Sequence, residues 1–250
     1  MTQDSLTTAP GHGPAHPETA PTLPAAVLWD MDGTLVDTEA LWVRAETELL
    51  ASYGAQLPDE AHERLVGSGL WGAAAYLQSL GVDLHPDEIV ARLATAVGEG
   101  IRAGESIWRP GARELLADLA QAGVPCALVT MSVRSLAELV LESLPAGTFQ
   151  VIVPGDEVTH EKPHPAPYLR GAELLGVPIG DCVALEDSPT GLRSAAASGA
   201  VSVGIPNMVD LSAAPAHRIL PTLVGVDSVG LGELFHEHHG TKPTEGPHTR

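Results

Sequence analysis

Positive charge is scarce in this sequence. Lys and Arg number 13 against 32 Asp and Glu, which gives a formal net charge of −19 at pH 7. Affinity for nucleic acid or for an anionic membrane surface depends on clustered Lys and Arg, and the chain has no such cluster. We therefore expect no nucleic-acid partner and no membrane partner. An anionic substrate would need a local positive site, and a bound metal ion is its simplest source.

Long apolar runs are absent, and cysteines are few. No run approaches the roughly 20 apolar residues that span a bilayer, and the first residues lack the basic start and apolar stretch of a signal peptide. The expected location is therefore the cytoplasm. The two cysteines, Cys126 and Cys182, lie in apolar, strand-like runs, so we expect buried free thiols rather than a disulfide or a metal pair.

The two ends of the chain lack hydrophobic periodicity. Residues 1–23 and 236–250 are rich in Pro, Thr, Gly and His, which predicts disordered tails. His236, His238 and His239 could bind metal, but a solvated tail is the preferred interpretation.

Between the tails, short apolar runs alternate with helical patterns. Strands are expected at 25–30, 126–130, 149–154, 182–187 and 201–206, and helices at 112–122, 133–143, 167–175 and 189–198. Continuous apolar strands separated by single helices are typical of the α/β class, with a doubly wound parallel sheet that is covered on both faces.

One stretch interrupts this alternation. Residues 39–107 contain no convincing strand, but they include amphipathic helical segments at 40–52 and 86–98. We therefore expect a core built from residues 24–38 and 108–235, with an all-helical domain inserted at 39–107.

Polar residues stand at the ends of three expected strands. Asp30 and Asp32 follow the first strand, Thr130 ends a later one, and Glu186 with Asp187 ends another; Lys162 lies on a loop. Ligands of open parallel sheets bind beyond the carboxyl ends of the strands. Together these residues offer a nucleophile, an acid, a metal site and a cation, which are the parts that phosphoryl transfer needs.

Each of these features also has a simpler interpretation. Gly33 would allow a tight turn whose backbone N–H groups face an anion, but acidic turns with Gly are common in solvent. Ser132 could begin a helix that binds a phosphate oxygen, or merely cap that helix. Lys162 is the only lysine outside the C-terminal tail, which suggests a need for a compact ammonium, although a surface position is the alternative.

The adjacent carboxylates of Glu186 and Asp187 would repel each other unless a cation lies nearby. Together with Asp30 and the main-chain carbonyl of Asp32, they suit an octahedral Mg²⁺ that keeps several waters. Mg²⁺ is therefore the expected cofactor.

Four segments resemble, in order, the four motifs of the haloacid dehalogenase superfamily. They are DMDGTLVDTE at 30–39, LVT at 128–130, GDEVTHEKPHP at 155–165 and LEDSPTG at 185–191. The resemblance covers roughly residues 25–235 and is strongest to the branch of sugar-phosphate phosphatases and β-phosphoglucomutase-like enzymes. It implies a Rossmann-like core with a helical cap at 39–107 that closes over the substrate. Glu161 and Ala166 depart from the family pattern, in which Gly and an acidic residue are frequent.

The resemblance also implies roles for the site residues. Asp30 would be the nucleophile and a metal ligand, and Asp32 the general acid/base, which binds metal through its main-chain carbonyl. Asp187 would bind Mg²⁺, with Glu186 beside it, directly or through water. The substrate-binding residues would be Thr130, Met131, Lys162 and Gly33.

The expected function is hydrolysis of a small phosphorylated metabolite, a sugar or polyol phosphate, through an aspartyl-phosphate on Asp30. Three alternatives remain: a phosphomutase with the same core, a haloacid dehalogenase that needs no metal, and a receiver module that is phosphorylated once on Asp. Residues 39–107 hold four arginines and eleven acidic residues, a balance of −7, which disfavours a mutase because its cap must hold a second phosphate. Trp71 could stack on a sugar face or lie in the core. The sequence does not predict the oligomeric state.

Overall fold

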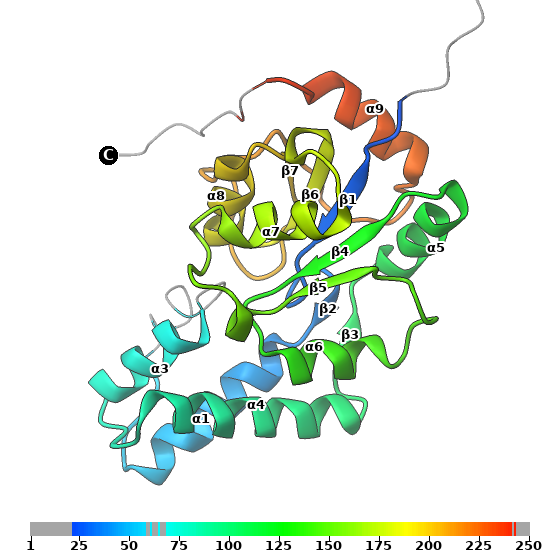
Figure 1. Cartoon of the computed structure of the whole chain (residues 1–250). Helices are drawn as coiled ribbons and strands as arrows, with labels where there is room; N and C mark the ends of the chain where they lie inside the picture. Colours follow the sequence, from blue (N-terminus) through cyan, green and yellow to red (C-terminus); the bar gives the residue numbers. More distant parts are fainter. Residues whose placement is uncertain (1–21, 59–60, 62–64, 66–68, 242, 244–250) are drawn as a thin grey trace, which may run out of the picture.

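The computed structural model describes residues 22–58, 61, 65, 69–241 and 243 (Figure 1). Its larger part is built on a six-stranded sheet with the strand order β5-β4-β1-β6-β7-β8, in which every neighbouring pair is parallel. The strands are β1 (Ala26–Trp29), β4 (Cys126–Val129), β5 (Val151–Val153), β6 (Cys182–Glu186), β7 (Val201–Gly204) and β8 (Arg218–Ile219).

Helices cover both faces of this sheet. They are α5 (Ala112–Ala122), α6 (Arg134–Leu141), α7 (Ala166–Leu175), α8 (Pro189–Ser198) and α9 (Ser228–His238), with short 3₁₀ turns η1 (Gly155–Glu157) and η2 (Ile179–Asp181). Alternate residues of β1 enter opposite cores. Val27 and Trp29 pack with residues of α5, α6 and α9, whereas Ala26 and Leu28 pack with residues of α7 and α8. Burial on both faces explains why the strands read as continuous apolar runs.

The helical insert forms a second body below the sheet in Figure 1. Its helices α1 (Glu39–Ser52), α3 (Leu70–Ser79) and α4 (Pro86–Arg102) share an apolar core of their own, to which Leu136 of α6 also contributes. The chain leaves the core domain through β2 (Val36–Asp37) and returns through β3 (Ile107–Trp108), and these two strands pair antiparallel. The β2–β3 pair is therefore the hinge through which the chain enters and leaves the insert, and α4 of the insert also packs against α6.

The observed architecture confirms the predicted fold class, and the boundaries differ in detail. The helix expected at 86–98 continues to Arg102, since Pro86 and two acidic residues begin it and Arg102 suits its negative end. At the C-terminus, α9 continues to His238, so helix occupies the first residues of the segment 236–250 that the sequence predicted as a tail. Most of the predicted tail at 1–23 lies outside the described residues. No helix in the described part of the chain is long and apolar enough to cross a membrane.

Candidate active site

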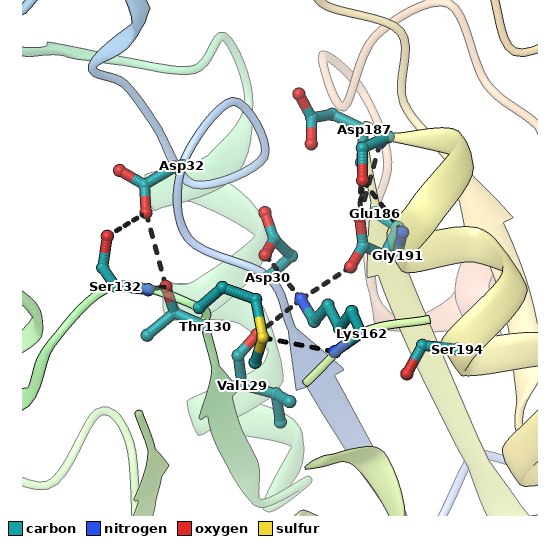
Figure 2. A network of polar contacts seen from close by, with 12 residues as sticks. Asp30, Asp32, Val129, Thr130, Ser132, Lys162, Glu186, Asp187, Gly191 and Ser194 are labelled. Atoms are coloured by element: carbon teal, nitrogen blue, oxygen red, sulfur yellow. Dashed lines mark hydrogen bonds and ion pairs between the residues drawn. The ribbon is translucent and has the colours of Figure 1, made fainter. Parts of the chain in front are cut away.

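The carboxyl ends of β4, β1 and β6 lie side by side and bring the predicted residues together (Figure 2). Trp29 of β1 is in register with Leu128 on one side and Leu185 on the other. Asp30 therefore stands at the centre, with Thr130 beside it at the end of β4 and Asp187 beside it at the end of β6. Parallel strands end at one edge of their sheet, which is why residues far apart in the sequence lie side by side here.

Lys162 is buried at the heart of this group, so the alternative of a surface lysine is wrong. Its Nζ donates to Asp30 Oδ1 at 2.7 Å, to Glu186 Oε1 at 2.7 Å and to the Val129 carbonyl at 2.9 Å. Burial alone would lower its pKa, but the carboxylates of Asp30 and Glu186 hold the pKa of Lys162 above its ordinary value. Figure 2 shows the ammonium between these two carboxylates.

Three carboxylates of this group fit a divalent cation. Asp30, Glu186 and Asp187 are buried, and each offers an oxygen within 4.8 Å of the others. Burial, and then the charge of Glu186, raises the pKa of Asp30 to about 7; burial and the charge of Asp30 raise the pKa of Asp187 well above its ordinary value. Asp30 Oδ2 is buried and has no hydrogen-bond partner among the described residues. The cluster has one ammonium group for three acidic groups. Its oxygen ligands and its excess of negative charge therefore both suit Mg²⁺.

Glu186 is held by the protein through both of its oxygens. Oε1 accepts hydrogen bonds from Lys162 and, at 2.7 Å, from the hydroxyl of Tyr168. Oε2 accepts from the Asp187 N–H at 3.2 Å and from the Ser188 hydroxyl at 3.3 Å. Sequence reasoning missed Tyr168, because a tyrosine at a helical core position carries no sign of a polar partner.

Asp32 receives hydrogen bonds from both the core and the cap. Its Oδ2 accepts from Ser132 Oγ at 2.7 Å and from Thr130 Oγ1 at 3.3 Å. Its Oδ1 accepts from Thr38 Oγ1 at 2.6 Å and from Trp42 Nε1 at 3.2 Å. Sequence reasoning missed Thr38 and Trp42. Their spacing of four residues, which places them on one side of the start of α1, was the available signal.

The loop after β4 differs from the prediction. Thr130 is fully buried, and its hydroxyl accepts from the Ser132 N–H at 2.9 Å, so the structure uses this hydroxyl within the protein. Ser132 is not the cap of α6, which begins at Arg134 with Val133 at the N-cap. Instead Ser132 and Met131 line the cavity above Asp30, and Met131 Sδ accepts the Lys162 N–H at 3.3 Å.

The N–H group of Gly33 itself is used within the turn and is not available to an anion. That group donates to the Val36 carbonyl at 2.7 Å. The residue has φ +87°, and a Cβ built on it would lie 2.0 Å from Asp187 Oδ2. Gly33 is therefore required for the turn and for the close approach of the Asp187 carboxylate.

A cavity of about 630 Å³ lies over the carboxylates, between the core and the cap. The core contributes Asp30, Asp32, Met131, Ser132, Lys162, Asp187 and Ser188, and α1 contributes Glu39, Trp42, Val43, Glu46, Thr47 and Ala51. Trp71 does not line it: its indole donates to Asp87 Oδ1 at 2.8 Å. The proposal that Trp71 stacks on a sugar is therefore wrong, and Trp42 is the tryptophan at this cavity. Residues 66–68 of the turn at 65–71 lie outside the described residues.

Comparison with known proteins identifies the family. Residues 27–205 match the family described as haloacid dehalogenase-like hydrolase. The chain belongs to this family. The chain is thus an enzyme, a hydrolase of the family that the sequence motifs resembled.

Two curated relatives and one solved structure share most of the chain. Hexitol phosphatase B of Escherichia coli is 32% identical over 72% of this chain and 83% of the relative. Fructose-1-phosphate phosphatase YqaB of Escherichia coli is 32% identical over 72% of this chain and 96% of the relative. The crystal structure of CbbY from Rhodobacter sphaeroides in complex with phosphate has a TM-score of 0.76 and 29% identity, covering 84% of this chain and 99% of that one.

Proposed function

We propose that this hydrolase is a Mg²⁺-dependent phosphatase that removes phosphate from a small metabolite through an aspartyl-phosphate on Asp30. The observation that carries the proposal is the position of Asp30. It lines the cavity, its Oδ1 is held 2.7 Å from the Lys162 ammonium, and Asp187 and Glu186 offer oxygens within 4.8 Å. A carboxylate in such a setting can attack phosphorus while its surroundings hold the phosphate charge.

The reaction would take two steps. The Asp30 carboxylate attacks phosphorus, the ester P–O bond breaks, and Asp32 gives its proton to the departing alkoxide oxygen. Asp32 then takes a proton from a water molecule, whose oxygen attacks phosphorus and breaks the bond to Asp30. Inorganic phosphate leaves, and both aspartates return to their starting states.

The remaining residues bind and orient the phosphoryl group. Lys162 neutralises one of its oxygens, and the loop of Thr130 and Met131 lies beside it. A bound Mg²⁺ would supply positive charge that offsets the negative charge of the carboxylates and of the phosphate. Asp30, Asp187 and the Asp32 carbonyl would hold the ion directly. Because protein donors already contact both Glu186 oxygens, contact of Glu186 through water is the favoured arrangement.

The proposed substrates are sugar and polyol phosphates. Two relatives named as a hexitol phosphatase and a fructose-1-phosphate phosphatase support this class, as does the acidic cap, which suits a substrate with one phosphate only. The buried free thiols of Cys126 and Cys182 support a cytoplasmic location.

The test is phosphate release from a panel of hexitol phosphates, aldose and ketose phosphates, and nucleotides, with and without Mg²⁺. We expect many turnovers per enzyme molecule, dependent on Mg²⁺ and fastest with a hexitol or sugar phosphate. Release of no more than one phosphate per molecule would overturn the proposal and favour a receiver module.

A further inference from the structure

Glu46 is a buried acid that the mechanism above does not use. It lies on α1, has 5% of its surface exposed, and lines the cavity over Asp30. No hydrogen bond or ion pair involves its carboxyl group within the part of the chain that the structure describes. Its oxygens are not among the fully buried side-chain atoms that lack a partner, so they remain accessible from the cavity. An acid presented in this way to a ligand cavity indicates a partner on the ligand.

The position of Glu46 places it at the distal end of a substrate. Trp42, one turn earlier on α1, contacts Asp32 at 3.2 Å, and Asp32 would protonate the ester oxygen. Four further residues advance the helix by about 6 Å on the same side. With C–C bonds of about 1.5 Å joined at tetrahedral angles, an extended chain advances about 1.3 Å per bond, so this is about the span of a five- or six-carbon chain. Glu46 is thus placed to meet a group several carbons away from the phosphate.

The surroundings of Glu46 define the chemistry of that group. Apart from Glu39, Trp42 and Glu46, the described cap residues that line the cavity are apolar or neutral: Thr47 and Gln56 are polar, and the apolar residues are Val43, Ala51, Ala55, Leu57, Pro58, Leu65, Leu70 and Ala73. Among the described lining residues, Lys162 at the Asp30 end is the only base. Among the described residues, a second phosphate at Glu46 would therefore meet an acid and no cation.

Burial and then the charge of Glu39 raise the pKa of Glu46 to about 8. Near neutral pH the side chain is therefore largely a neutral acid, which both donates and accepts hydrogen bonds. A hydroxyl group also donates and accepts, and it matches this partner without adding a charge to an apolar wall.

We propose that Glu46 determines specificity by hydrogen-bonding a substrate hydroxyl that is distal to the phosphate ester. This inference rests on the proposed function, since it requires the phosphate to lie at Asp30. It extends that function by assigning the recognition of a polyhydroxyl chain to one residue of the cap.

The test compares two substrates in Glu46→Leu, Glu46→Gln and native enzyme. Sorbitol 6-phosphate carries distal hydroxyls and p-nitrophenyl phosphate carries none. We expect Glu46→Leu to lower kcat/KM for sorbitol 6-phosphate about 10- to 100-fold, largely through KM, and to leave kcat/KM for p-nitrophenyl phosphate within about threefold. Glu46→Gln, which also donates and accepts, should restore most of the loss. Glu48→Leu, an exposed position on the same helix, is the matched control.

The outcomes separate this proposal from the function on which it rests. Equal losses with both substrates in Glu46→Leu, or no loss with either, would overturn the role of Glu46 alone. A native preference for glucosamine 6-phosphate over glucose 6-phosphate that Glu46→Gln abolishes would also overturn it, in favour of ammonium recognition by a carboxylate. If native enzyme releases phosphate from none of these esters, the proposed function itself is wrong.

Discussion

Asp30 provides the sharpest test at the scale of a single residue. Asp30→Asn keeps the size of the side chain and an acceptor for Lys162, but it loses the negative charge that attacks phosphorus. We expect kcat to fall at least 10³-fold, about 4 kcal/mol in barrier, while circular dichroism and the unfolding temperature show a native fold. Asp83→Asn, at an exposed position of the cap, should retain native activity. Activity of Asp30→Asn within about tenfold of native would contradict the assignment of the nucleophile.

A second residue-scale prediction concerns the pH dependence of stability at Glu46. Its pKa is about 8 in the folded protein and 4.5 ordinarily. The unfolded chain therefore releases the proton first, and the contribution of Glu46 to stability is largest at low pH, falls as pH rises from about 4.5 to 8, and then levels off. Glu39 faces Glu46 on the same helix, and other charged groups line the same cavity: Asp30, Asp32, Lys162 and Asp187.

Glu46→Gln removes this titration. The unfolding temperature of Glu46→Gln relative to native enzyme should therefore rise between pH 5 and pH 8. Thermal unfolding at a series of pH values measures this difference, and Glu48→Gln serves as the control with no such trend. A difference that stays constant over the range would show that Glu46 is not a proton-retaining buried acid.

At the scale of elements, the loop after β4 is positioned by η1. Gly155 of η1 donates its N–H to the Ser132 carbonyl at 2.8 Å, and a Cβ built on it would lie 2.2 Å from the Met131 carbonyl oxygen. Gly155→Ala would force apart two backbone segments, one of which lines the cavity. We expect a loss of about 1–3 kcal/mol in stability and a fall in kcat/KM.

The matched control for Gly155 is Gly180 of the other 3₁₀ turn, η2. A Cβ there meets nothing within 4 Å, so Gly180→Ala should change stability by no more than about 0.5 kcal/mol. Denaturant unfolding and steady-state kinetics on both variants measure the contrast. Equal effects of the two substitutions would show that η1 does not position the loop.

At the scale of the whole molecule, folding gathers acidic groups that a metal ion would offset. The chain carries a net charge of −19, and the fold places Asp30, Glu186 and Asp187 within one buried cluster. An ion that binds the folded state alone stabilises it by about 2.7 kcal/mol at a concentration 100 times its Kd. We therefore expect Mg²⁺ to raise the unfolding temperature, EDTA to abolish activity, and added Mg²⁺ to restore it.

Asp187→Asn should remove most of the Mg²⁺-dependent rise in unfolding temperature. Asp210→Asn, at an exposed position away from the cluster, should keep it. Full activity in excess EDTA would contradict the metal role and favour the dehalogenase alternative.

The charge of the cap leads to a second prediction at this scale. The balance of −7 in residues 39–107 makes the cap a poor partner for a doubly phosphorylated intermediate. Supplied with β-glucose 1-phosphate and catalytic glucose 1,6-bisphosphate, the enzyme should release inorganic phosphate faster than it forms glucose 6-phosphate. Coupled assays of both products measure the ratio, and faster formation of glucose 6-phosphate would indicate a mutase.

Local pattern determined the elements and the position of the site along the chain. The helix predicted at 112–122 matches α5 residue for residue, since its apolar period and the glycine that follows it are local signals. Asp30, Thr130, Glu186 and Asp187 could be assigned to the site because parallel strands end at one edge of a sheet. The excess of acidic residues indicated that an anionic substrate would need a local cation.

Tertiary structure alone decided the partners of these residues. The bond from Lys162 to Asp30 joins positions 132 residues apart, and the donors to Asp32 come from both domains. Glu46 is one of eleven acids in residues 39–107, and sequence reasoning did not use its place on the apolar side of α1, one turn from Trp42 and Leu50. Its burial depends on which side of α1 faces the core domain. Packing between the insert and the core domain decides which side of α1 this is. The contacts that make up this packing join residues far apart in the sequence, so local pattern does not predict them.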